Sequence, residues 1–269
     1  MVYRLIIYFS FYSFVGWLYE STLYTITHKK LINRGFLNGP CCPIYGFGAV
    51  IDWLCLGRLS NPVAIFFAGM ALCCSLEYFT SWFLEKVFHA RWWDYSQRKF
   101  NIKGRICLLG AFVFGTMSVI VVKIVHPFVS GKLDLFTDKQ IMWVAIGLLI
   151  IFFIDTVATV FQLTKFNEKL KDLQASINNF LNEARTYADN AKNSISSNAR
   201  AKIETVRSKL GGNAAENVGG DEIDNTIMAK LKNLSLSRRE KNLSKNIYRS
   251  TRYNDAMDKI REFLGIKKN

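Results

Sequence analysis

Long apolar stretches alternate with short polar connections over the first 163 residues, and a polar, basic stretch follows them. A helix that crosses a bilayer needs roughly 20 mostly apolar residues, because the hydrocarbon core is about 30 Å thick and a helix rises about 1.5 Å per residue. Four stretches meet this requirement, and a fifth is shorter and contains Asp52. The pattern predicts an all-α, polytopic helical membrane protein with a transmembrane domain at 1–163. Its five spans are expected at about 3–26, 44–60, 62–84, 106–129 and 141–163.

The hydrophobic period changes after Leu163. From Phe166 to Ala191, apolar residues recur at alternating spacings of four and three, which is typical of a coiled-coil seam, and a stutter follows up to Leu210. This predicts a long cytoplasmic helix over 164–210 that continues from the last span and pairs with a second copy, giving a homodimer through 166–210. A single helix that lies over the chain's own loops fits the same pattern.

The last part of the chain is a basic amphipathic tail at 226–269, reached through a glycine-containing linker at 211–225. Within it, Tyr253, Met257 and Ile260 fall on one helical face. Basic amphipathic helices beside a membrane usually rest on anionic lipid, so membrane lipids are the expected partner. Nucleic-acid binding is the weaker interpretation, because no recognised motif accompanies the charge.

Charge sets the expected orientation in the cell membrane. The chain carries 35 Lys+Arg and 21 Asp+Glu, a net charge of +14. In the apolar part, Lys and Arg concentrate in the connections at 28–34 and 86–105, and short basic connections stay cytoplasmic. We therefore expect a multi-pass protein with its N-terminus outside and its C-terminal tail cytoplasmic. The first apolar run is too long for a cleaved signal peptide.

The six cysteines predict neither a metal site nor a redox centre. They lie in or beside the apolar segments, and the adjacent pairs lack the C-x-x-C spacing of zinc or redox sites. No cofactor is expected, and the cysteines are interpreted as small apolar residues in packed helices.

Four carboxylates lie inside the predicted spans: Glu20, Asp52, Glu77 and Asp155. Charged groups in a bilayer are costly, so each is a candidate for a functional site. Three of them fall at a similar depth in the cytoplasmic half, with Asp52 nearer the middle. They could form a cation or proton site. Alternatively, arginines entering at the same end could neutralise them and only fix the packing.

The segment 34–48 combines glycines with Pro40 and Pro43, which do not fit inside a regular helix. Irregular backbone at membrane depth is tolerated where protein or a water-filled cavity surrounds it. This favours a re-entrant or broken helix that offers backbone groups to a ligand, although a simple turn before the second span fits as well. Asp94 and Tyr95 of the next connection are expected to hydrogen-bond to this segment. The candidate substrate or ion-site residues are Glu20, Arg34, Asn38, Tyr45, Asp52, Glu77, Trp93, Tyr95, Arg105 and Asp155.

Several short motifs in the first 165 residues carry a family resemblance. They are Gly16-Trp17 with Glu20, Arg34-Gly-Phe-Leu-Asn-Gly-Pro40, Pro43-Ile-Tyr-Gly46, Trp93-Asp-Tyr-Ser96 and Asn101-Ile-Lys-Gly-Arg105. In these, the chain resembles the bacterial membrane-protein family of the ABC-transporter type IV, or CmpB-type permease, kind. The resemblance implies a permease, and it carries over no catalytic residues. Because the chain has no G-x-x-x-x-G-K-[ST] phosphate loop, such a permease would need a separate ATP-binding subunit, for which 86–105 is the candidate coupling surface.

Three functions follow as hypotheses. The leading one is a permease-like integral membrane protein. The second is a membrane enzyme acting on a lipid-type substrate, with Glu20, Glu77 or Asp155 as acid or base and Arg34 or Arg105 on a phosphate. It lacks a recognised nucleophile or metal constellation, so an enzyme is the less favoured interpretation. The third is a membrane scaffold or regulator that assembles through its cytoplasmic helix.

Overall fold

The computed structural model describes residues 1–28, 35–194, 231, 236, 238–247, 249–250 and 253–264. The chain is mostly helical and divides into two compact units. The first unit holds residues 1–165 with 245–252, and the second holds 166–244 with 253–269. Arg34, the linker at 211–225 and the part of the predicted seam beyond Ser194 lie outside the described residues.

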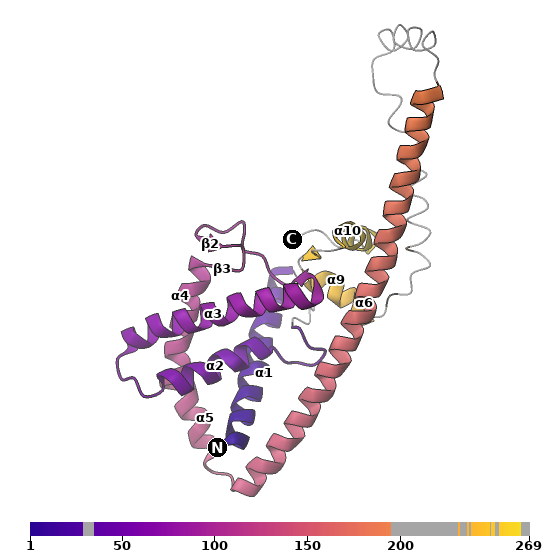
Figure 1. Ribbon diagram of the computed structural model, residues 1–269. Helices are drawn as coiled ribbons and strands as arrows, with labels where there is room; N and C mark the ends of the chain where they lie inside the picture. Colours follow the sequence, from indigo (N-terminus) through magenta and orange to yellow (C-terminus); the bar gives the residue numbers. More distant parts are fainter. Residues whose placement is uncertain are drawn as a thin grey trace. The chain divides into compact units, whose positions relative to one another are not determined.

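The first unit is built from apolar helices that pack in sequence order (Figure 1). They are α1 (Val2–His28), α2 (Pro43–Leu56), α3 (Pro62–Phe88), α4 (Leu108–Ile120), α5 (His126–Leu133) and the first half of α6 (Asp138–Ser194). Helix α1 packs against α2, α2 against α3 and α3 against α4. One cluster of buried side chains joins α1, α2, α5 and α6 through Tyr8, Tyr12, Ala49, Leu133 and Ile141.

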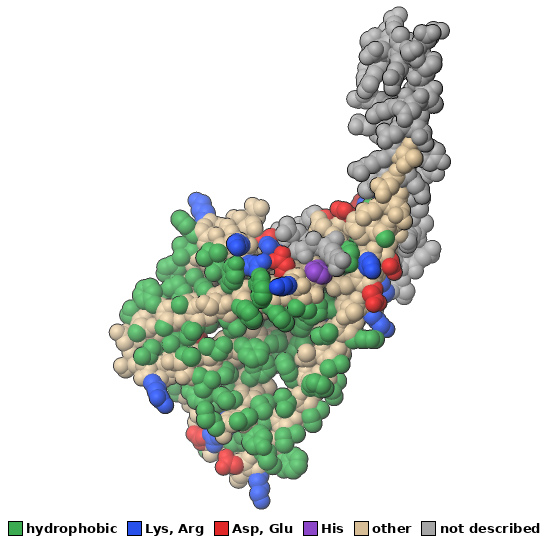
Figure 2. Space-filling model, in the orientation of Figure 1, with side chains coloured by type: hydrophobic (Ala, Val, Ile, Leu, Met, Phe, Trp, Pro, Cys, Tyr) green, Lys and Arg blue, Asp and Glu red, His purple; other side chains and the backbone are tan. Residues whose placement is uncertain are grey.

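Among the described residues, three helical segments are long and apolar enough to cross a membrane: Pro62–Phe88, Leu108–Leu133 and Asp138–Asn179. Only 17%, 17% and 11% of their most apolar windows are buried within the protein. Over the first unit, Figure 2 shows a broad band of apolar side chains, with charged ones gathered mainly at its margins. A surface this apolar is stable in lipid and not in water.

Helices α1 and α2 are not among these three segments. Helix α1 has 27 residues, but tyrosine and serine recur along it. Helix α2 has 14 residues, so it rises only about 21 Å and is shorter than the span expected at 44–60. The non-helical residues 35–42 precede it, and Pro43 is its first residue, a position where the missing N–H costs nothing.

The second of these apolar segments, Leu108–Leu133, is interrupted by a π-helical turn, η1 (Val121–Val125). Pro127 follows directly, and a proline inside a helix cannot donate to the carbonyl one turn earlier. The widened turn accommodates it, with the His126 N–H donating to the Val121 carbonyl.

Short strands tie the connections of the first unit together. β1 (Ala90–Arg91), just after α3, pairs antiparallel with β4 (Arg249–Ser250), and β2 (Asn101–Ile102) pairs with β3 (Ile106–Cys107). The partner of β1 therefore comes from the far C-terminal part of the chain.

In the second unit, helix α6 presents a buried apolar stripe made of Phe166, Leu170, Leu173 and Ile177. Helices α9 (Arg238–Asn246) and α10 (Asn254–Phe263) pack against α6. Lys169 forms an ion pair with Glu240 at 2.8 Å, and the Ala256 amide donates to Gln174 Oε1 at 3.0 Å. Met257 and Ile260, on the apolar face of α10, are fully buried.

This packing bears on two expectations. The continuous helix is present as predicted, but the described part of its seam is covered by the chain's own C-terminal helices instead of a second copy. Among the described residues of the basic tail, the apolar face of α10 is buried against α6, and contact of the tail with lipid stays a prediction. An amphipathic stripe needs an apolar partner, and here two stripes of one chain supply it for each other.

We expect Ile260→Asp to detach α10 from α6, because it places a charge at a fully buried apolar position. The unit should become several-fold more sensitive to limited proteolysis and should self-associate in detergent through the uncovered stripe. Phe263→Asp, at a partly exposed position of the same helix, is the matched control and should behave as the wild type. Equal proteolysis of both variants would contradict this packing.

Candidate functional site

Two carboxylates predicted inside spans, Glu20 of α1 and Glu77 of α3, are each bonded to a tyrosine. Tyr45 at the start of α2 donates to Glu20 Oε1 at 2.5 Å. Tyr95, in the connection after α3, donates to Glu77 Oε1 at 3.1 Å. We call these four residues the inner acid cluster. The similar depth expected for these two acids and Asp155 in the membrane stays a prediction.

The two acids of the cluster act on the same phenol. Burial and the charges of Glu77 and Glu20 raise the pKa of Tyr95 above its ordinary value, so its O–H stays protonated and donates. Glu77 is 6% exposed, and its Oε2 is buried without a hydrogen-bond partner among the described residues. An unpartnered buried carboxylate oxygen is costly, and it is the kind of group that takes a proton or a cation.

Asp155 of α6 does not join that cluster through any described contact; it holds the segment 35–42. Its two oxygens accept from the amides of Asn38 at 3.1 Å and Gly39 at 2.9 Å. Thr159, one turn further along, accepts from the Asn38 side chain at 3.1 Å. Irregular backbone therefore lies against the apolar part of α6, as expected for a re-entrant segment, but two amides expected to face a ligand are occupied by Asp155.

Asp52 lies apart from both groups, between α2, α3 and α4. It is 2% exposed, its Oδ2 lies 3.5 Å from the Cys73 thiol, and its Oδ1 has no partner among the described residues. The Ser118 hydroxyl of α4 donates to the Phe114 carbonyl at 2.9 Å and lies 3.9 Å from the Cys73 sulfur. Gly69 of α3 faces Ser118 with no room for a side chain, so the two helices pack closely beside this acid.

The expected pairing of these acids with arginine is not seen in the described part of the chain. Arg105 instead forms an ion pair with Glu85 Oε2 at 2.8 Å, and Arg91 binds the same oxygen at 2.9 Å. Glu85 lies in the last turn of α3, and its side chain is only 19% exposed, so the two cations compensate a largely buried charge. Arg34 lies outside the described residues.

Trp93 and Asp94 form hydrogen bonds within the connection between α3 and α4. The Trp93 indole donates to the Arg105 carbonyl at 3.1 Å. Asp94 accepts from the Ser96 amide at 2.9 Å, and Tyr95 bonds to Glu77. Within the described residues, the bonds of Asp94 and Tyr95 thus run to Ser96 and to Glu77, and the expected hydrogen bonds to the 34–48 segment stay a prediction.

His126, a buried histidine of α5, is a site residue that the sequence reasoning missed. Its Nδ1 lies 3.2 Å from the Tyr12 hydroxyl, its ring stacks on Trp53 with centroids 4.4 Å apart, and Tyr8 packs edge-on at 4.6 Å. A histidine inside a predicted span is an ionisable group, like the four carboxylates considered in the sequence analysis. The position of His126 in the apolar stretch 106–129 could therefore have identified it.

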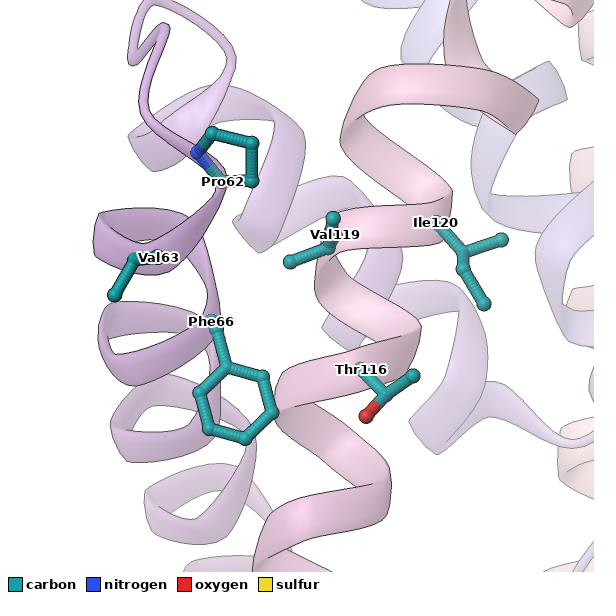
Figure 3. A pocket seen from close by; sticks show the side chains of 6 residues that line it. All are labelled: Pro62, Val63, Phe66, Thr116, Val119 and Ile120. Atoms are coloured by element: carbon teal, nitrogen blue, oxygen red, sulfur yellow. The ribbon is translucent and has the colours of Figure 1, made fainter.

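An apolar groove of about 370 Å³ lies between the start of α3 and the second half of α4 (Figure 3). Its lining residues are Pro62, Val63, Phe66, Thr116, Val119 and Ile120. The only hydroxyl among them, Thr116, donates to the Phe112 carbonyl of its own helix. The groove fits acyl chains and offers no charged or free polar group to a polar substrate.

These features define a mostly helical protein with ionisable groups held between apolar helices, three of which, among the described residues, are long enough to cross a membrane. The family described as "Putative ABC-transporter type IV" matches residues 7–160. The chain belongs to this family, which agrees with the resemblance read from its motifs. No curated protein and no solved structure gives a match to the chain. The family description and the apolar helices together indicate an ABC-transporter-related protein located in a membrane.

Proposed function

We propose that this protein is a permease-like membrane component of a transporter, and that its inner acid cluster binds a proton or a small cation. The observation that carries the proposal is the bonding of Glu77: one oxygen is held by a neutral phenol, the other has no partner among the described residues, and Glu20 lies near enough to act on the same phenol.

Two carboxylates in a low-dielectric region cannot both stay charged without a compensating positive charge. In the described part of the chain, no lysine or arginine forms an ion pair with either acid. Two arginines of the connection after α3, Arg91 and Arg105, are already engaged by Glu85. A bound proton or cation would supply the missing charge, and tyrosines would orient the carboxylates without neutralising them.

The energy source we propose is a separate ATP-binding subunit. The family description supports this partner, and the chain lacks a phosphate-loop motif of its own. Five crossings in a transmembrane domain at 1–163, with the N-terminus outside and the tail cytoplasmic, remain part of the proposal. In that arrangement the inner acid cluster opens toward the cytoplasmic side, where the coupled subunit would act.

The other two functions gain less support. The enzyme hypothesis needs Arg105 on a phosphate, and that side chain binds Glu85 and lies over the Tyr78 ring. The scaffold hypothesis needs an open seam on α6, and the described part of that seam is covered by α9 and α10. No contact among the described residues specifically favours the enzyme hypothesis or the scaffold hypothesis.

The test is the thermal stability of the full chain in detergent with Na⁺, K⁺ or choline as the cation, at slightly acid and slightly alkaline pH. Binding to the folded state should raise the melting temperature by about 3–6 °C at ten times the dissociation constant. Glu77→Gln should abolish this response to the cation or to the proton, because it removes the charge at the unpartnered oxygen.

Glu85→Gln is the matched control on the same helix. It removes a carboxylate that is already paired with Arg91 and Arg105, so the melting temperature should change but its response to cation and pH should persist. A wild-type chain that melts equally in every salt and at both pH values overturns the proposal, as does a full response in Glu77→Gln.

A further inference from the structure

The hairpin formed by β2 and β3, just before α4, exposes two large apolar side chains among cations. Phe100 is 79% exposed and Ile102 is 56% exposed. Arg98, Lys99 and Lys103 are exposed beside them, and residues 96–104 contain no acidic residue. Two fully presented apolar side chains within one basic tip are unusual for a surface that meets only water.

The hairpin holds this tip in a fixed shape. The Asn101 side chain donates to the Arg98 carbonyl at 2.8 Å and accepts from the Gly104 amide at 3.0 Å. Phe100 and Lys103 have φ values of 53° and 52°, in the left-handed region that side chains other than glycine disfavour. The network therefore imposes an unfavourable backbone on Phe100, and the result is that its ring points outward. Such local strain is a reason to look for a function at the tip.

A backbone hydrogen bond also fixes the hairpin to the first residue of α4. The Leu108 amide donates to the Phe100 carbonyl at 3.1 Å, and Leu108 is the first residue of the membrane-crossing segment Leu108–Leu133. The backbone of Phe100 is thus hydrogen-bonded to the first residue of this apolar segment. In Figure 2, basic and apolar side chains lie together over this hairpin, next to the apolar band.

We propose that residues 98–103 form a membrane-contacting finger that binds the headgroups of anionic lipids, with Phe100 and Ile102 entering the interfacial layer. Aromatic and aliphatic side chains favour that layer, and lysine and arginine favour a negatively charged leaflet. A protein partner with an acidic surface would match the charges, but lipid is already present at the level where α4 begins. The position therefore favours lipid over a protein docking on the finger.

The test places an environment-sensitive fluorescent amino acid at position 100 of the full chain, reconstituted in two kinds of vesicle. One contains phosphatidylcholine alone, and the other contains phosphatidylcholine with phosphatidylglycerol. Nitroxide groups on the upper acyl chain report lipid contact, and aqueous iodide reports exposure to water. We expect quenching by the lipid nitroxide, several-fold stronger in the anionic vesicles, with protection from iodide.

The matched variant changes Arg98, Lys99 and Lys103 to glutamine and keeps the probe at position 100. It should lose the difference between the two vesicles. Strong iodide quenching in both vesicles overturns the proposal and points to a protein partner at this finger. Equal nitroxide quenching in neutral and anionic vesicles overturns the preference for anionic lipid.

Discussion

Gly46→Leu is expected to separate helices α1 and α2 and to leave little folded protein. A Cβ at Gly46 would overlap the Ser13 hydroxyl and lie 2.6 Å from the Phe9 carbonyl oxygen. The carbonyl belongs to the α1 backbone and cannot rotate away. In lipid, helices associate through close packing and not through the hydrophobic effect, so losing this approach removes much of what holds the pair together.

The expected cost is at least about 4 kcal/mol, in the range reserved for overpacked or disrupted cores. We expect the melting temperature in detergent to fall by more than about 8 °C, or the variant to elute as aggregate in size-exclusion chromatography. Gly147→Leu on α6 is the matched control, since nothing lies within 4 Å of a Cβ built there. If both variants melt at the wild-type temperature, the close contact between α1 and α2 is wrong.

The second large effect is expected from Asp155→Leu, which removes the carboxylate that holds the segment 35–42. The Gly39 amide would be left without its acceptor against an apolar helix, at a cost of about 1–3 kcal/mol, and the Asn38 amide would keep only Thr159 Oγ1 at 3.2 Å. The segment should leave its place on α6, and hydrogen exchange at these two amides should accelerate by a hundredfold or more.

Thr159→Val is the comparison for this effect. It removes one acceptor of the Asn38 amide and side chain and leaves the carboxylate in place, so the exchange rates should rise by tenfold or less. Identical exchange in the two variants would show that Asp155 is not what holds the segment. Asp155→Asn, which keeps one acceptor oxygen, should fall between them.

The helices of this protein could be predicted from hydrophobic periodicity. A membrane span or a coiled-coil seam depends only on the spacing of apolar residues within one continuous segment. The continuous helix through Leu163, the family and the non-helical stretch before Pro43 all came from such local patterns. The count of five crossings stays a prediction, since three helical segments among the described residues are long and apolar enough to cross, and Pro43–Leu56 is shorter than a bilayer.

The partners of the charged side chains could not be predicted in the same way. Glu77 and Glu85 stand two turns apart on α3, yet one binds a tyrosine and the other two arginines. That choice depends on how the connection after α3 folds, which involves residues far along the chain. Likewise, the apolar stripe at Phe166 does not say whether lipid, a second copy or the chain's own tail covers it.

The pairing of β1 with β4 has a consequence for how the chain is assembled. During synthesis, Ala90–Arg91 leaves the ribosome long before Arg249–Ser250 does, so the edge of β1 stays open while the apolar helices insert. The C-terminal segment then closes that edge as one of the last steps. Pairing of the β1 edge thus depends on a segment made more than 150 residues later, and a chain that stopped before Arg249 would leave that edge unpaired.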